Sequence, residues 1–379
     1  MKINLDDNKL NLRFAPLTFT RPVGNLRMGI LCNNERWQMY IPEAEIGFIS
    51  EKYLQQKYPK IKDAIQVNAA IIPNEDVAAA VFNLEDNATL FFSKQWIAKR
   101  GNGKTKLQFK GESPVIISER WDLFLHNGLV LKQDFNLITS GRKSQKISKT
   151  NTLIGDSKLI FVEEGALIEG AILNTTDGPI YIGHSAEIME GSLIRGPFAL
   201  CEKSTLKLGT KVYGATTIGP SCKIGGEISN VIFQSFSNKG HDGFLGNSVI
   251  GEWCNLGAGT NSSNLKNNYG EISSFSYQKN CDTKTKQQFI GLFMGDHSKC
   301  AINTAFNTGT VVGVSVNVFC SDFPPKKISS FSWGTPKGFV AFDFQKALES
   351  ARNMMERRSL ELSEEEIKIL QHLNNNKEI

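Results

Sequence analysis

The stretch that decides the fold is residues 182–224, IGHSAEIMEGSLIRGPFALCEKSTLKLGTKVYGATTIGPSCKI. An aliphatic residue returns there at every sixth position: Ile182, Ile188, Ile194, Leu200, Leu206, Val212, Ile218 and Ile224. A six-residue period fits neither an α-helix nor a single β-strand. It is typical of hexapeptide repeats, in which each short strand forms one wall of a coil and points one side chain inward. The stretch therefore predicts a parallel β-helix.

The same period continues on both sides of this stretch in shifted phases. An earlier phase comprises Ile154, Ile160, Ala166 and Ile172. Two later phases comprise Ile232, Asn238, Phe244, Ile250 and Leu256, and then Met294, Cys300, Phe306, Val312 and Val318. We expect the β-helix to occupy residues 152–322, with a polar excursion at 265–288. Long loops in compact domains are commonly functional.

The remaining chain lacks this period. Residues 1–145 alternate short apolar runs with amphipathic stretches, which predicts a small α/β domain. A polar, basic segment at 139–151 has the composition of a linker. Residues 323–379 form a C-terminal extension, in which 343–374 has the pattern of one or two amphipathic helices.

Composition narrows the classes of function. The chain has 379 residues and a net charge of +5, and its 43 basic residues are scattered. Scattered charge speaks against nucleic-acid binding and is compatible with a pocket for anionic small molecules. Seven cysteines never reach CxxC spacing, so we expect no metal site and no disulfide framework. With no apolar segment long enough for a membrane helix and no apolar leader, the expected location is cytoplasmic, without membrane association.

Near the N-terminus, residues 13–22 read RFAPLTFTRP. This segment resembles the R-x-x-P-L-T-x-x-x-P signature of sugar-nucleotide pyrophosphorylases. The resemblance implies that Arg13, Thr18, Arg21 and Arg27 bind a nucleotide, with Mg²⁺ and UTP required if the domain is active. However, residues 6–12 contain no glycine where that family has a phosphate-cradling loop. A reduced domain, retained for packing or for weak ligand binding, is the alternative.

The most specific segment is residues 239–264, KGHDGFLGNSVIGEWCNLGAGTNSSN. It resembles the acetyltransferase site of the GlmU-like family, the bifunctional N-acetylglucosamine-1-phosphate uridyltransferases and glucosamine-1-phosphate acetyltransferases. The order of the regions along the chain also agrees with that family. The resemblance implies a reduced nucleotidyltransferase-like α/β domain followed by a left-handed parallel β-helix, with C-terminal helices.

The same resemblance implies roles for individual residues. His241 would be the general base, oriented by Glu227, because the ordinary pKa of histidine lies near the operating pH. The other positions implied are Asn264 and Phe244 as sugar contacts, with Lys239 and Lys266 as replacement cations. His297 is a second candidate base. Ser229 stands where the family has a basic residue, which puts glucosamine 1-phosphate in doubt as the acceptor.

Three functions remain open from the sequence. The first is acetyl-CoA-dependent N-acetylation of an amino-sugar phosphate, with acetyl-CoA as co-substrate. The second is synthesis of a nucleotide sugar from a sugar 1-phosphate through the Arg13 motif. The third is a non-enzymatic, trimeric sugar-nucleotide-binding protein. The family resemblance implies a homotrimer, and we expect the 265–288 excursion to reach toward the next subunit.

Overall fold

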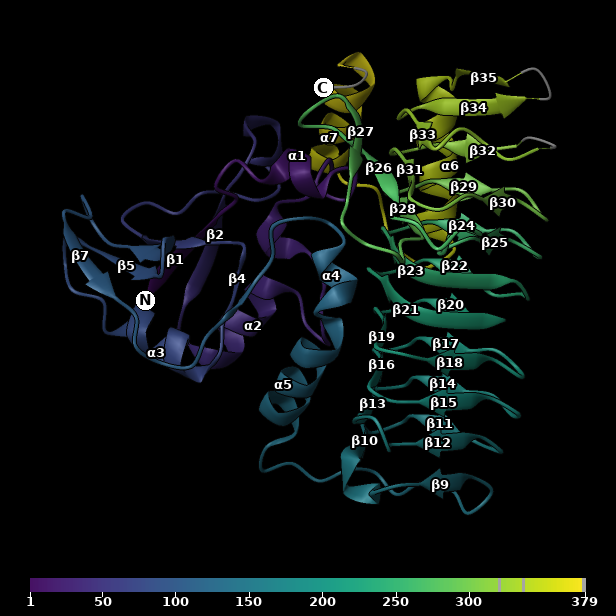
Figure 1. Ribbon diagram of the computed structural model, residues 1–379, viewed down its shortest axis with the longest axis horizontal. Helices are drawn as coiled ribbons and strands as arrows, with labels where there is room; N and C mark the ends of the chain where they lie inside the picture. The colour runs from purple at the N-terminus through teal and green to yellow at the C-terminus, as the bar shows by residue number, and fades with distance from the viewer. Residues whose placement is uncertain (320–321, 336–337, 377–379) are drawn as a thin grey trace.

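A computed structural model describes residues 1–319, 322–335 and 338–376 of the chain. It consists of an N-terminal α/β domain, a tall β-helix beside it and two C-terminal helices (Figure 1). The expected class, an α/β domain followed by a left-handed parallel β-helix, is confirmed. Of the described helices, none is long and apolar enough to cross a membrane.

A mixed six-stranded sheet forms the centre of the N-terminal domain, in the order β2-β1-β3-β6-β5-β7. Its strands are β1 (Lys2–Asp6), β2 (Glu45–Ile49), β3 (Ile65–Asn68), β5 (Ala88–Phe92), β6 (Gln95–Lys99) and β7 (Thr105–Gln108). A short pair, β4 (Ile71–Ile72) and β8 (Val115–Ile116), lies apart. The helices are α1 (Asn11–Phe14), α2 (Asn33–Tyr40), α3 (Glu75–Phe82), α4 (Asp122–Leu125) and α5 (Asn127–Thr139). Alternating apolar residues such as Ile3 and Leu5 on β1 are fully buried.

Three walls of stacked parallel strands make up the β-helix. The wall that faces the N-terminal domain, here the domain-facing wall, comprises β10 (Ile160–Val162), β13 (Ile180–Ile182), β16 (Phe198–Leu200), β19 (Thr216–Ile218), the second halves of β21 (Glu227–Phe233) and β23 (Phe244–Ile250), β28 (Leu292–Met294), β31 (Thr310–Val312) and β33 (Lys327–Ile328).

The second wall, here the groove wall, comprises β11 (Leu167–Ile168), β14 (Glu187–Ile188), β17 (Thr205–Leu206), β20 (Lys223–Ile224), β22 (Asn238–Lys239), β24 (Asn255–Leu256), β29 (Lys299–Cys300), β32 (Asn317–Val318) and β34 (Ser332–Thr335), with β35 (Gly338–Ala341) antiparallel at its edge. The outer wall comprises β9 (Thr152–Ile154), β12 (Ile172–Asn174), β15 (Leu193–Arg195), β18 (Lys211–Tyr213) and the first halves of β21 and β23, followed by β25 (Asn261–Ser262) paired with β30 (Ala305–Phe306).

The register of the six-residue period is right in the deciding stretch and in the last phase. Every aliphatic residue of the period from Ile182 to Ile224 is buried in the interior of the β-helix, as are the five residues of the last phase. The neighbouring phases are partly wrong. Ile154 and Ile172 remain 44% and 37% exposed, and Leu173 fills the interior position beside Ile172.

Residues 232–244 are out of register by one. The interior side chains are Phe233, Lys239 and Leu245, in register with Ile218, Ile224 and Ile228 of the preceding coil. The reason is that β21 runs unbroken over seven residues across a corner, so this coil is shorter than its neighbours. Ile232 consequently faces outward, where it joins the core shared with the N-terminal domain.

That shared core holds the two domains together. Outward-facing Val249, Phe293 and Val311 of the domain-facing wall are fully buried and belong to the same apolar cluster as the interior of the α/β domain. Helices α4 and α5 lie along this wall (Figure 1). The amide of Asn127, at the start of α5, donates to the Ala215 carbonyl and to the Thr217 hydroxyl, both at 3.1 Å.

The 265–288 excursion contains a hairpin, β26 (Ser273–Ser276) and β27 (Cys281–Lys284). It packs on the N-terminal domain of its own chain, and the expected contact with a next subunit stays a prediction. The Tyr277 ring lies edge-on to Phe19 at 5.0 Å, and the buried Arg120 guanidinium donates to the Ser274 hydroxyl at 2.9 Å. Apolar contact and a buried donor therefore fix the excursion within the chain.

The C-terminal helices, α6 (Phe344–Glu356) and α7 (Glu364–Asn375), lie against the β-helix. Their apolar stripes, including Leu348 on α6 and Ile369 and Leu370 on α7, are buried in the shared core. Ser363 accepts from the Glu366 amide, while the Glu366 carboxylate accepts from the Ser363 amide, a capping box that starts α7. Two arginines that follow α6 directly, Arg357 and Arg358, lie at the groove wall.

Candidate functional site

His241 lies at the corner where the groove wall turns into the outer wall. It is exposed and lines a groove of about 600 Å³ between this corner and the end of α6. The other lining residues are Lys207, Lys223, Asn238, Gly240, Asn255, Leu256, Gly257, Ala258, Ile302, Met354, Arg357 and Arg358. The motif that singled out His241 thus lies in a cavity large enough for a small-molecule substrate.

The backbone conformation at Gly243 determines the turn at this corner. Gly243 has a φ of +119°, and a Cβ there would lie 2.1 Å from the Thr260 carbonyl oxygen. Gly246, three residues later in β23, lies close to two side chains. A Cβ on Gly246 would lie 2.7 Å from Cζ of Phe244 and 2.6 Å from Nδ2 of Asn264. The positive φ and the nearby backbone oxygen leave no room for a side chain at Gly243, so only glycine allows the chain to turn there.

Lys239 lies beneath the corner, in the interior of the β-helix. Its side chain is completely buried in register with Ile224, and its ammonium donates to the carbonyl of His241 at 2.7 Å and to that of Gly225 at 3.4 Å. The ammonium does not line the groove. The structure therefore gives Lys239 a position from which it holds the His241 backbone, where the sequence suggested a substrate contact.

Burial lowers the pKa of Lys239 to about 8 from its ordinary 10.5. Between these two values the unfolded chain keeps a proton that the folded chain has lost, so the free energy of unfolding should rise with pH across this window. Below it both states are protonated and the cost of burying the charge is fully present. We expect this contribution to differ by roughly 2–3 kcal/mol between about pH 7 and about pH 10.

Urea denaturation of the wild type and of Lys239→Met at both pH values measures this effect. The gain in stability at high pH should be present in the wild type and reduced in the variant by the amount above. An identical pH dependence in both proteins would show that the buried ammonium does not titrate in this window.

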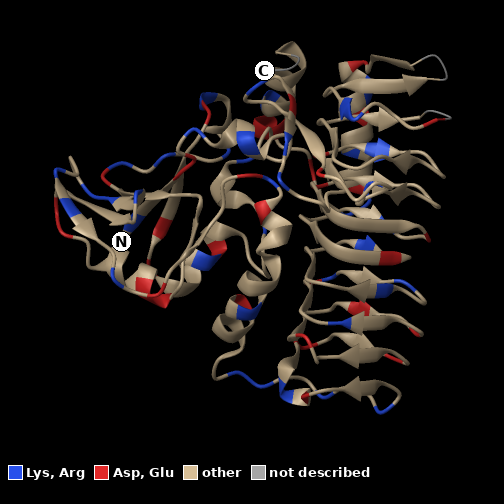
Figure 2. Cartoon of the chain, viewed as in Figure 1, with Lys and Arg blue, Asp and Glu red and all other residues tan. Residues whose placement is uncertain are grey.

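Four cations surround the groove: Lys207 and Lys223 from the β-helix, and Arg357 and Arg358 from the end of α6. Burial, together with the charges of Arg358, Lys207 and Arg357, lowers the pKa of Lys223. Arg358 is tied to the wall by a 3.4 Å bond to the Asn238 side chain. Elsewhere in the view of Figure 2 both signs of charge are interspersed. Like charges gathered at one groove favour a ligand with phosphate groups.

The sugar contacts implied by the resemblance lie on the outer wall, around the corner from the groove. Glu227 and Phe244 are partners in register on adjacent strands. The Glu227 carboxylate accepts from the Tyr213 hydroxyl at 2.6 Å, and the Asn264 amide donates to Asn247 at 2.8 Å. Within the described residues no hydrogen bond or ion pair joins Glu227 to His241. The two implied catalytic residues therefore share a corner region without contact.

The remaining candidates lie away from the groove. His297 is half-buried beside Trp253, and burial lowers its pKa to about 3. The cavity beside His297 measures only about 20 Å³, too small for a substrate, so the geometry favours His241 in its groove of about 600 Å³. Lys266 donates to the Glu271 carbonyl within the excursion and does not line the groove.

The N-terminal arginines do not converge on a common pocket. Arg13 pairs with Glu119, and Arg27 with Glu35 at 3.4 Å. Arg21 is buried against two carboxylates of the β-helix, Glu252 at 2.8 Å and Asp296. Thr18 donates to the Asn11 carbonyl within its own loop. Three of the four implied nucleotide ligands are thus engaged in separate ion pairs, and Arg21 joins the two domains.

The acid at the end of β1, Asp7, fits a magnesium ion poorly. In the part of the chain that the structure describes, no three His, Cys, Asp or Glu side chains are grouped so that they could hold a metal ion. Asp7 is buried and accepts from the Val23 amide at 2.8 Å. Burial raises its pKa well above the ordinary value, which disfavours the charged form that a cation needs.

Comparison with known proteins finds two similarities by sequence. Residues 3–143 match the family described as sugar nucleotidyl transferase. The bifunctional protein GlmU of Wigglesworthia glossinidia brevipalpis is 30% identical over 178 residues, which cover 45% of this chain and 32% of that protein. The chain thus matches about a third of that relative's length.

Two solved structures are also similar. A hexapeptide transferase family protein from Anaplasma phagocytophilum is 16% identical, with a TM-score of 0.24, over 60% of this chain and 87% of that one. A UDP-N-acetylglucosamine acyltransferase from Campylobacter jejuni is 14% identical, with a TM-score of 0.28, over 61% and 97%. By sequence, therefore, the N-terminal region is similar to sugar nucleotidyl transferases, and part of the chain is similar to a bifunctional GlmU protein.

Proposed function

We propose that the protein is a transferase of sugar-nucleotide metabolism that moves an acetyl group from acetyl-CoA to the nitrogen of an amino-sugar phosphate. The observation that carries the proposal is an exposed histidine, His241, at the end of a groove lined by four cations. A neutral imidazole supplies the base, and the cations supply binding for the phosphates of the donor.

In the proposed reaction the sugar amine attacks the thioester carbonyl. A nitrogen–carbon bond forms, the carbon–sulfur bond breaks, and the His241 imidazole accepts the proton that the amine releases. The same imidazolium can return this proton to the departing CoA thiolate, so the step is balanced without a further reactant. Lys239 takes part as a positioning residue, because its ammonium holds the carbonyl of His241.

The acceptor would lie on the outer wall, next to Phe244, Asn264 and Glu227. The side chain of Asn264 is only partly buried and offers hydrogen-bonding atoms for sugar hydroxyls. Phe244 offers a ring face but no hydroxyl, and Ser229 offers no charge, so this surface has little to hold an acceptor phosphate. A panel of amino-sugar phosphates, each assayed as acceptor, identifies the amino sugar.

Reversing the charge of the groove should weaken donor binding without stopping the reaction. The double variant Arg357→Glu/Arg358→Glu is expected to raise KM for acetyl-CoA by roughly tenfold or more, with little change in kcat, since exposed charge pairs contribute up to about 1 kcal/mol each. Steady-state kinetics of CoA release gives both constants. The control is Lys94→Glu, an exposed lysine of the N-terminal domain. An unchanged KM for acetyl-CoA would show that these arginines do not bind the donor.

Nucleotidyl transfer is the second candidate, favoured by the family match over residues 3–143. The ion pairs of Arg13, Arg21 and Arg27, and the burial of Asp7, which raises its pKa, speak against it. Release of pyrophosphate from UTP in the presence of a sugar 1-phosphate, lost in Arg13→Ala, would establish it. Tight binding of a sugar nucleotide with no turnover in either assay would favour the non-enzymatic alternative. A homotrimer remains part of the proposal, to be checked by light scattering.

A further inference from the structure

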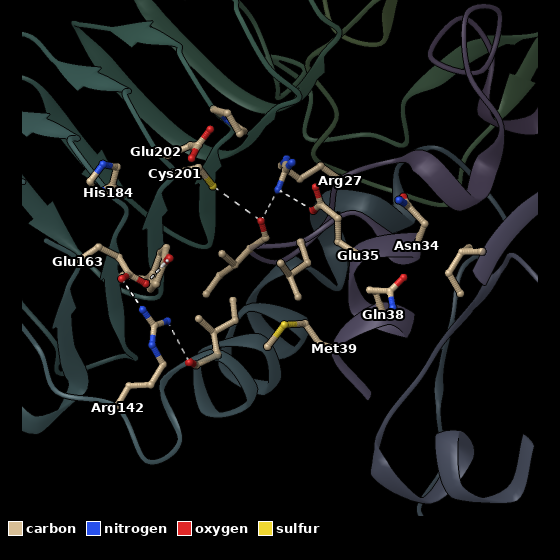
Figure 3. Close-up of a pocket in the computed structure, with 16 residues that line it drawn as sticks. Arg27, Asn34, Glu35, Gln38, Met39, Arg142, Glu163, His184, Cys201 and Glu202 are labelled. Carbon is tan, nitrogen blue, oxygen red and sulfur yellow. Dashed lines mark hydrogen bonds and ion pairs between the residues drawn. The ribbon is translucent and has the colours of Figure 1, made fainter. Parts of the chain in front are cut away.

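A second cavity, of about 860 Å³, lies between the N-terminal domain and the lower part of the domain-facing wall (Figure 3). One side comes from α2, with Asn34, Glu35 and Gln38, and the other from the β-helix, with Glu163, His184 and Glu202. It shares no lining residue with the His241 groove. This interdomain cleft is therefore a separate place where a ligand could bind.

Arg27 projects into the cleft with hydrogen-bonding capacity to spare. Its side chain is 7% exposed. Its Nη1 donates to the Ile30 carbonyl and lies 3.4 Å from Oε2 of Glu35. Nε is buried without a partner, and no described residue accepts from Nη2. The backbone of Arg27 is fixed to the β-helix, because Gln234 accepts from its amide at 2.8 Å and donates to its carbonyl at 3.2 Å. A rigidly held guanidinium with unused donors needs oxygen acceptors.

The walls of the cleft are rich in planar polar groups and close to neutral. Arg142 pairs with Glu163, whose other oxygen accepts from the Tyr181 hydroxyl at 2.9 Å. Each arginine in the cleft therefore already has a carboxylate partner. By contrast, the carboxylate of Glu202 has no hydrogen bond or ion pair to another residue that the structure describes. The cleft has no surplus positive charge for a phosphate, but it has several groups that accept from hydroxyls.

Apolar side chains complete the cleft between these polar walls. They are Ile30, Leu31, Met39, Ile46 and Ile138. Apolar surface next to planar amide, carboxylate and guanidinium groups suits a molecule with an apolar ring face and hydroxyls at its edge. We infer that the interdomain cleft binds an uncharged sugar, through Arg27, Asn34, Gln38 and Glu202. The volume is in the range of ordinary small-molecule sites, and the inference does not depend on acyl transfer at His241.

Isothermal titration of the full chain tests this site. The panel comprises uncharged hexoses and N-acetylhexosamines, each compared with its 1-phosphate. At least one uncharged sugar should bind, and the affinity should fall by roughly tenfold or more in the double variant Gln38→Ala/Glu202→Gln, since each removes a hydrogen-bonding group from the site. Both side chains are exposed, so the variant should fold, and its thermal unfolding is measured to verify this.

Two controls separate this site from the His241 groove. Glu190→Gln changes an exposed carboxylate of the β-helix outside the cleft, and His241→Ala changes the groove; neither should alter the affinity. Absence of binding by every uncharged sugar would overturn the inference. It would also be overturned if the phosphates bound more tightly than the free sugars, or if His241→Ala abolished binding, because the sugar would then lie in the groove.

Discussion

Replacing His241 by alanine is expected to lower kcat for acetyl transfer by roughly 10²–10⁴-fold, the usual contribution of a general base. The side chain is exposed at a corner, and the turn itself is held by Gly243 and by the Lys239 ammonium, so the fold should persist. KM for acetyl-CoA should change little, because the cations of the groove remain. The measurement is the rate of CoA release at saturating acetyl-CoA with a panel of amino-sugar phosphates.

The control for this experiment is His126→Ala, a histidine between α4 and α5 that lies outside the groove. It should retain the wild-type rate. If His241→Ala also retained that rate, the base would have to be another group, and the groove would lose its catalytic role. Circular dichroism and thermal unfolding of both variants distinguish a chemical effect from loss of folded protein.

Removing the charge of Arg21 is expected to destabilise the protein by about 3–5 kcal/mol, the usual effect of breaking a buried ion pair. Its side chain is 5% exposed, and the substitution Arg21→Met would leave the buried Asp296 carboxylate, and the partly exposed Glu252, without their cation. Thr20 donates to the same Asp296 carboxylate at 2.7 Å, so two neighbouring residues of the 13–22 segment hold this carboxylate. The loss should appear as a lower midpoint in urea denaturation.

Arg13→Met provides the matched comparison, because it removes an arginine of the same motif from a partly exposed pair. Arg13 and Glu119 are 33% and 27% exposed, so the expected loss is at most about 1 kcal/mol. Equal effects of the two substitutions would contradict the assignment of Arg21 as the residue that joins the domains. The pair of variants therefore compares the two positions of one motif directly.

The β-helix could be predicted from the sequence because each interior position repeats the same requirement for an apolar side chain. The prediction was wrong where the coil length changes, at Ile232, Asn238 and Phe244. A strand that crosses a corner, as β21 does, shifts the register by one residue, and a period alone cannot reveal this. The position of Lys239 was missed for the same reason. A lysine in the interior breaks the apolar pattern by which interior positions are identified.

The site was only partly accessible from the sequence. His241 was found through its motif, whereas the cations of the groove come from separate parts of the chain. Arg357 and Arg358 lie more than a hundred residues after His241 and reach the groove only through the packing of α6 on the shared core. The role of Arg21 could not be foreseen either, since its partners Glu252 and Asp296 are distant in sequence and neither belongs to a motif that predicts ion pairing.

The most direct test of the proposed acetyl transfer is to incubate the full chain with acetyl-CoA and each amino-sugar phosphate, and to identify the product by mass spectrometry. The proposal predicts CoA release that depends on the acceptor, with the acetyl group on the sugar nitrogen, and near-complete loss of this product in His241→Ala. No acceptor-dependent product across the panel, or an equal yield from His241→Ala, would contradict it.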